Sequence, residues 1–180
     1  MKKILAIVLA ITMLALVSCS SLPSTKGMIK KSVGGVTKID LYYGSANGKD
    51  MTGFNVREIK GIASGAFAAP VINSLPFIAY VFKLDGTVPV DEFKNTLKEN
   101  CDLVWNICTS ADTVICESEG EYVLFAMIDM DGETGLPKGT DEKIINNFCS
   151  LGCKKYIVDE DKEIISTLAG INKKQTSTAL

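Results

Sequence analysis

The pattern of apolar and polar positions becomes regular in the second half of the chain. Residues 76–84 (PFIAYVFKL) form a nearly continuous apolar run, which predicts a buried strand. Asp91 can cap the helix that follows, and apolar residues then recur with helical spacing at Phe93, Leu97, Cys101, Val104 and Cys108. A shorter alternation favours a strand in the same region, at Leu103, Trp105 and Ile107. The longer helical series makes the helix the preferred prediction.

A hairpin and a second helix come next. Residues 113–117 and 122–129 are rich in β-branched and aromatic residues, and a Ser-Glu-Gly turn separates them. A helix is predicted over residues 140–151, since acidic residues occupy its first turn and a glycine follows it. Residues 154–158 predict an edge strand, and residues 159–170 predict a last short helix.

The predicted order over residues 76–170 is therefore β-α-β-β-α-β-α. This is the split βαβ order of ferredoxin-like folds with one added helix, so we expect an α+β sandwich of that type. The first and third strands would be central, and they are the two most apolar runs. A ferredoxin-like fold hosts many functions, so the fold alone names none.

The residues that precede this domain are predicted to form an N-terminal β extension over 36–75. Residues 36–43 read as a strand, and residues 54–62 read as the strand that returns after an Asn-Gly turn. Residues 63–70 (ASGAFAAP) are small and apolar. They favour either a short helix or a cover over the sheet, and the sequence does not decide between them.

Two polar segments flank the predicted domain. Residues 19–35 are rich in Ser, Gly and Lys, which predicts a flexible tether. Residues 171–180 are polar and are expected to fray.

The N-terminus carries the most specific motif. Two lysines precede an apolar run, 4–17, which is shorter than the ~20 residues that a membrane span needs and is typical of an export signal. The run ends in Leu16-Val17-Ser18-Cys19, which resembles the lipobox of bacterial lipoproteins. An ordinary secretory signal or an uncleaved anchor is the alternative interpretation.

The lipoprotein resemblance implies a location and a modification. Residues 1–18 would be a signal peptide, cleaved between Ser18 and Cys19, and Cys19 would carry a diacylglycerol-type lipid with further acylation such as palmitate. Several acyl chains on one residue anchor a protein stably, where a single chain is marginal. The resemblance therefore places the chain on a bacterial cell membrane, facing outside the cytoplasm, with the lipid bilayer as its first partner.

Charge and composition narrow the function. The 180 residues include 19 basic and 21 acidic side chains and no histidine. Removal of the two signal-peptide lysines would leave a net charge of −4, so nucleic acid is not an expected partner. There is no nucleophile elbow and no phosphate-binding glycine loop, and no catalytic residue is predicted.

The other cysteines are Cys101, Cys108, Cys116, Cys149 and Cys153. Their spacings contain no C-x-x-C and no zinc pattern, so core packing is the main expectation, with one structural disulfide as an alternative. The acidic run after residue 128 lacks the Gly and Glu that a calcium loop requires at its sixth and twelfth positions. No metal site or other cofactor is predicted.

Two functions remain in different classes. The first is a non-enzymatic, membrane-tethered envelope module that binds an envelope protein or a small ligand, or serves structurally. Trp105 and Tyr122 are the candidate contact surface for it, because aromatic residues anchor many interfaces. The alternative is an extracytoplasmic thiol-redox or metal-binding lipoprotein that uses Cys149 and Cys153.

Overall fold

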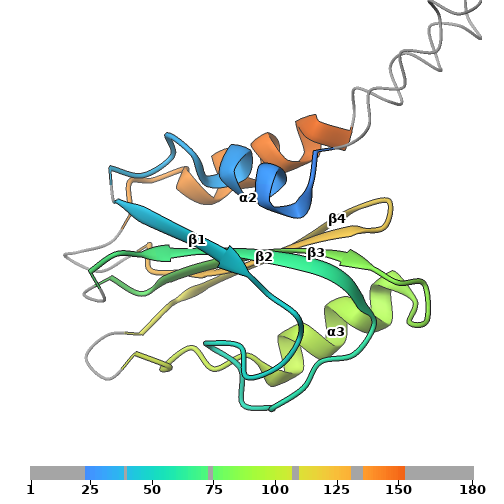
Figure 1. Ribbon diagram of the computed structural model, residues 1–180. Coiled ribbons are helices and arrows are strands. Elements are labelled where there is room, and N and C mark those ends of the chain that lie inside the picture. The colour runs from blue at the N-terminus through green and yellow to red at the C-terminus, as the bar shows by residue number, and fades with distance from the viewer. Residues whose placement is uncertain (1–22, 39, 73–74, 107–109, 131–135, 153–180) are drawn as a thin grey trace, which may run out of the picture.

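A computed structural model of the chain describes residues 23–38, 40–72, 75–106, 110–130 and 136–152. Five strands form one antiparallel sheet in the order β1-β2-β3-β5-β4, with helices on both faces (Figure 1). The elements are α2 (Thr25–Val33), β1 (Leu41–Ser45), β2 (Ile62–Pro70), β3 (Phe77–Leu84), α3 (Val90–Asn100), β4 (Thr113–Glu119) and β5 (Tyr122–Ile128), followed by a helix over residues 140–152. Within these ranges, no helix has the length and apolar character that crossing a membrane requires.

The sheet is buried on both faces. We call the face beneath α2 and the 140–152 helix the upper face, and the face above α3 the lower face, as oriented in Figure 1. Alternate residues of β3 point to opposite sides, so Ala79 and Val81 join the upper cluster while Tyr80 and Phe82 join the lower one. Burial on both faces explains the continuous apolar run of β3, which the sequence correctly predicts as a strand.

Helix α2 corrects the prediction of a flexible tether over residues 19–35. The Ser24 side chain caps the helix by accepting a hydrogen bond from the Gly27 amide at 3.2 Å. Met28, Ile29 and Val33 are then buried against the upper face. Tertiary burial stabilises this short helix, whose glycine and serine give it little intrinsic helical preference.

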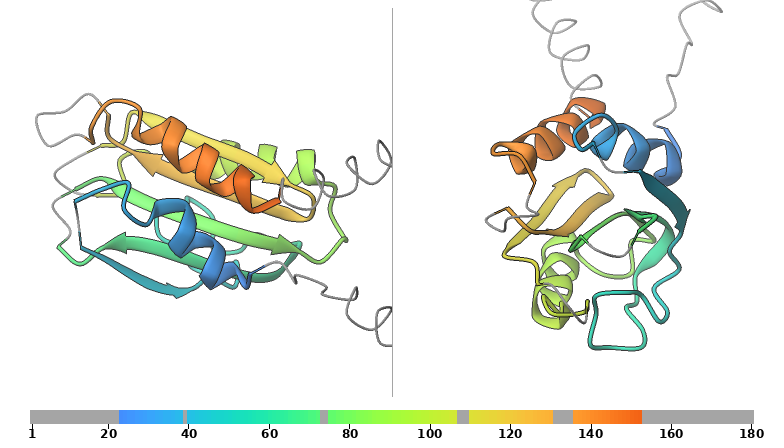
Figure 2. Two further views of the ribbon diagram at one scale, coloured as in Figure 1. Left: turned by 90° about the horizontal axis from the view of Figure 1, so that it is seen from above. Right: turned by 90° about the vertical axis from the view of Figure 1, so that its left-hand side faces the viewer.

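The 140–152 helix lies beside α2 on the upper face (Figure 2). Asn147 Nδ2 donates a hydrogen bond to the Ser32 carbonyl oxygen at 3.2 Å, and Ile144 and Phe148 are fully buried in the shared cluster. The sequence prediction of a helix over 140–151 is confirmed. Together the two helices and the residues that flank them, 24–36 and 137–152, form one layer, which we call the helical layer.

The strand that returns after β1 is β2, so its prediction over residues 54–62 is wrong. The undecided segment 63–70 supplies this strand, with Leu41 opposite Pro70 and Ser45 opposite Ala66. Small side chains suit the position, since Ala66 and Ala68 are buried beneath α2. Residues 36–75 thus contribute β1 and β2 to the same sheet as the later strands.

Helix α3 ends at Asn100, and the predicted continuation to Cys108 is wrong. Cys101 is extended, with φ −74° and ψ 143°, and forms an isolated antiparallel bridge with Phe54. Val104, predicted on the buried stripe, is 66% exposed. A contact between distant segments therefore ends the helix before the apolar series does.

The structure is α+β, but the ferredoxin-like topology is not confirmed. The predicted hairpin is present as β4 and β5, and β3, α3 and β4 form a split β-α-β unit with β5 between the two strands. The position beside β3 that the prediction gives to residues 154–158 is occupied by β2. Residues 154–158 and the predicted helix over 159–170 lie outside the described residues.

Candidate functional site

The most distinctive feature of the lower face is the connection between β1 and β2, residues 46–61, which we call the cover loop. The loop is held at its base by backbone contacts. The Ile59 amide donates to the Gly48 oxygen at 2.8 Å, and the Asp50 amide donates to the Arg57 oxygen at 2.8 Å. Loops of this length are uncommon in compact domains and are often functional.

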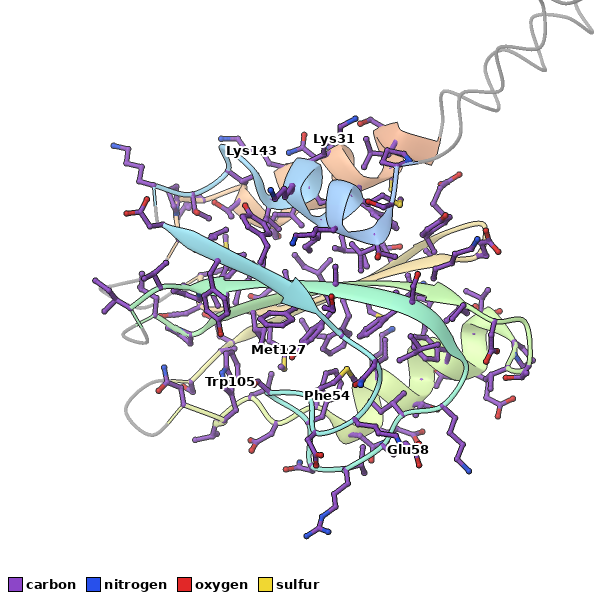
Figure 3. All side chains as sticks on the ribbon, in the orientation of Figure 1. Lys31, Phe54, Glu58, Trp105, Met127 and Lys143 are labelled. Carbon is purple, nitrogen blue, oxygen red and sulfur yellow. The ribbon has the colours of Figure 1, made fainter. Side chains whose placement is uncertain are left out.

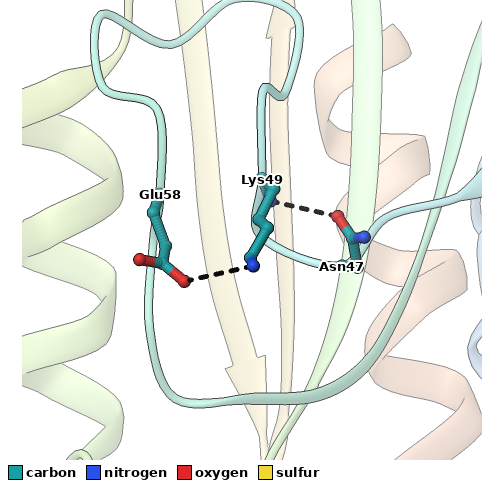
Figure 4. A network of polar contacts seen from close by, with 3 residues as sticks. All are labelled: Asn47, Lys49 and Glu58. Carbon is teal, nitrogen blue, oxygen red and sulfur yellow. Dashed lines mark hydrogen bonds and ion pairs between the residues drawn. The ribbon is translucent and has the colours of Figure 1, made fainter.

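Polar side chains at the base of the cover loop contribute little to its stability. Lys49 Nζ lies 4.0 Å from Glu58 Oε1, and Asn47 Oδ1 accepts a hydrogen bond from the Lys49 amide at 3.1 Å (Figure 4). Both members of the ion pair are more than half exposed, so the pair contributes at most about 1 kcal/mol. The backbone pairing, not the ion pair, sets the shape of this region.

Phe54 attaches the far end of the cover loop to the sheet. Its ring centroid lies 5.2 Å from that of Phe125 and 5.8 Å from that of Tyr80. Backbone hydrogen bonds of 2.9 Å flank it, from the Asn55 amide to the Asn100 oxygen and from the Asp102 amide to the Gly53 oxygen. Figure 3 shows Phe54 beneath the sheet, on the same side as Trp105 and Met127.

A cavity of about 190 Å³ lies between the cover loop and the sheet. Aromatic side chains of β2 and β3, Phe67 and Tyr80, form part of its wall. The rest is formed by Ser45 at the end of β1 and by cover-loop residues Ala46, Asn47, Lys49, Asp50, Met51 and Thr52. Pockets for drug-sized ligands usually measure ~300–1,000 Å³. The cavity therefore suits a small polar ligand with an apolar side.

Tyr80 is fixed in the cavity wall as a hydrogen-bond donor. Its hydroxyl donates to the Thr52 carbonyl oxygen at 2.8 Å. Burial first, and the nearby Tyr42 second, raise the pKa of Tyr80 far above the usual phenol value. The phenol therefore stays protonated throughout the physiological range, and it holds the loop rather than acting as a base.

The described cysteines lie on separate faces of the sheet. Cys101 and Cys116 pack in the lower cluster, whereas Cys149 packs against the upper one. No disulfide joins these three cysteines to one another, and burial raises the pKa of both the Cys101 and Cys116 thiols. Thiols of raised pKa are poor nucleophiles at neutral pH, so these two behave as core residues.

The thiol-redox alternative depends on Cys153, which lies outside the described residues together with Cys108 and with Ser18 and Cys19. The sheet separates Cys149 from Cys101 and Cys116, so a direct disulfide between the two faces does not fit this geometry. Over the described ranges, no group of three or more Cys, Asp or Glu side chains is placed to hold a metal ion.

The structure does not bring the two predicted contact residues together. Trp105 is partly buried against the lower cluster, whereas Tyr122 is only 7% exposed and belongs to the upper cluster. Phe67 and Tyr80 are not among the site residues that the sequence predicts. The sequence feature that could have indicated this site is the long polar stretch of the cover loop. It can be recognised as a loop only once β2 is assigned to residues 62–70.

Comparison of the chain with protein families, with curated proteins and with solved structures gives no significant match.

Proposed function

We propose that this chain is a lipid-anchored bacterial envelope protein whose domain binds or supports other molecules without catalysing a reaction. The signal peptide is cleaved after Ser18, and Cys19 carries a diacylglycerol-type lipid. The lipobox-like sequence Leu16-Val17-Ser18-Cys19 is the observation that carries this proposal. The absence of histidine from the sequence, which removes the commonest general base, supports a non-enzymatic role.

The anchor is tested by metabolic labelling of bacteria that express the full chain with an alkyne-bearing palmitate analogue. The wild-type chain is expected to incorporate the label and to lose residues 1–18, as read from the mass of its N-terminal peptide. Cys19→Ser should lose the label, whereas the control Cys149→Ser should keep it. Equal labelling of wild type and Cys19→Ser contradicts the proposal.

The cavity beneath the cover loop is the proposed ligand site of the domain. It combines two aromatic side chains with five polar lining residues, a more polar wall than most small-molecule sites have, so a small and largely polar ligand is the expected occupant. Ligand screening by NMR should shift the amide signals of residues 47–52 while leaving those of the turn at 85–87 unchanged. Ser45→Leu, which narrows the cavity, should weaken such binding.

The matched control for this variant is Ser64→Leu, because Ser64 is exposed and does not line the cavity. Ligand-induced shifts spread evenly over the surface, or equal binding by both variants, would rule out the cavity as the ligand site.

A further inference from the structure

Charge is distributed unevenly between the helical layer and the other described residues. The helical layer, taken as residues 24–36 and 137–152, carries five lysines: Lys26, Lys30, Lys31, Lys138 and Lys143. Its acids are Asp141 and Glu142, and Glu119 joins them because it approaches Gly152 at one end. The layer therefore has a net charge of +2, and the other described residues, with seven basic and twelve acidic side chains, have a net charge of −5.

Most lysines of the helical layer face outward. Lys26, Lys31 and Lys143 are exposed, and Figure 3 shows Lys31 and Lys143 on the outer side of the layer, with Glu58 on the opposite side of the molecule. Lys30 is also exposed, but its ammonium group lies 5.3 Å from the centroid of the Tyr43 ring on β1. The ion pairs among the described residues join Lys49 to Glu58, Lys83 to Glu121 and Lys94 to Glu117, all outside the layer. The positive charge of the layer is therefore available to a partner.

Chain length places this layer close to the proposed anchor. Four residues separate Cys19 from Ser24, the cap of α2. At ~3.3–3.6 Å per residue, the five steps from Cys19 to Ser24 span at most about 18 Å. The Debye length at physiological ionic strength is about 8 Å, so α2 is held within roughly two Debye lengths of the surface that holds Cys19.

We propose that the helical layer docks on an anionic lipid surface and that the cavity beneath the cover loop faces away from it. The orientation rests on the proposed anchor at Cys19. Exposed lysines held near anionic headgroups each gain about fivefold in affinity for the surface, while the net negative charge of the other described residues disfavours contact through the rest of the domain. The cavity then remains accessible to a ligand approaching from outside.

The test measures lysine accessibility in the full chain reconstituted into vesicles. One vesicle type contains phosphatidylcholine alone, and the other contains in addition about 30% phosphatidylglycerol, enough to give a negative surface potential. A membrane-impermeant amine-acylating reagent is applied, and mass spectrometry compares Lys26, Lys31 and Lys143 with Lys60 and Lys98 in the same molecules. Lys60 lies in the cover loop and Lys98 on α3, both exposed on the lower side.

Docking predicts that the layer lysines react at least about fivefold more slowly than Lys60 and Lys98 in anionic vesicles, and that 1 M salt removes the difference. Neutralising Lys26, Lys31 and Lys143 to Gln should lower the docked-to-undocked ratio about a hundredfold, which can be read by amide hydrogen exchange on α2. The matched control, Arg57→Gln with Lys60→Gln and Lys98→Gln, should leave the protection of α2 unchanged.

Equal reactivity of both lysine sets in the two vesicle types overturns the proposal. A second result also overturns the proposal: a soluble polyanion added to neutral vesicles protects the layer lysines, but anionic vesicles do not. The partner would then be an anionic polymer and not the lipid surface. The mass of the N-terminal peptide reports lipidation in the same sample. An unlipidated chain whose layer is still protected would contradict the anchor and support the docking, so the two proposals fail separately.

Discussion

Replacement of Phe54 by alanine should release the cover loop from the sheet. Full burial makes a Phe→Ala change cost ~3–5 kcal/mol, and Phe54 is partly buried with ring contacts to Phe125 and Tyr80 at 5.2 and 5.8 Å. We therefore expect a loss of about 2–3 kcal/mol in the free energy of unfolding. For a domain of this size that corresponds to a decrease of roughly 6–12 °C in Tm.

The assay combines thermal unfolding of the detergent-solubilised chain with amide hydrogen exchange. Because Phe54 holds a loop, its replacement should speed the exchange of the amides of Asn55 and Asp102, which donate hydrogen bonds at the loop tip. This increase over the wild-type rate should be larger than the increase at the amides of β5. The control is Tyr42→Ala, since Tyr42 is 50% exposed and touches one ring, that of Phe67. A loss of stability no larger than in the control, or unchanged exchange at the loop tip, would refute the assigned role of Phe54.

Three further predictions concern the backbone, a tyrosine and a thiol. Gly48→Ala should destabilise the fold more than Gly86→Ala, as measured by denaturant unfolding. The two glycines have similar φ angles of 85° and 82°, but of the two only Gly48 lies where an added Cβ would meet a backbone oxygen, that of Ile59. Burial raises the folded-state pKa of Tyr80, so the stability that Tyr80 contributes is complete below the unfolded-state pKa of ~10 and is lost as the pH rises above it. Urea titrations of Tyr80→Phe should therefore show a smaller loss of unfolding free energy between pH 10 and 12 than those of the wild type. An equal loss in the two proteins would contradict this prediction. The Cys116 thiol, whose pKa burial raises, should resist iodoacetamide at pH 7.5 until the chain unfolds, and rapid alkylation in the native state would show that it is not a core residue.

Local patterns were sufficient to predict the β4–β5 hairpin and the 140–152 helix. The hairpin β4–β5 is defined by its own turn, in which Gly120 has a φ of 57°, and by apolar residues on both of its strands. The 140–152 helix follows from its stripe of Ile144 and Phe148. In these elements the residues that carry the signal also make the stabilising contacts.

The candidate site could not be derived in the same way, because its parts come from four separate segments. The cavity needs the cover loop, β2 and β3 together, and the loop is held by Phe54 against residues near the end of α3. No periodicity in residues 46–61 indicates that they cover a sheet. Only the pairing of Phe54 with Cys101 shows where the loop attaches and why α3 stops at Asn100.

The sequence by itself determined an α+β protein with a buried central strand, a hairpin and two amphipathic helices, and it carries the lipobox-like motif on which the proposed location rests. Tertiary structure alone decided that residues 25–33 are helical and that the alanine-rich segment of residues 62–70 is a strand. The physical reason is burial. Met28 and Ile29 gain stability only against the sheet, and small side chains such as Ala66 and Ala68 are suited to β2 because α2 packs over them.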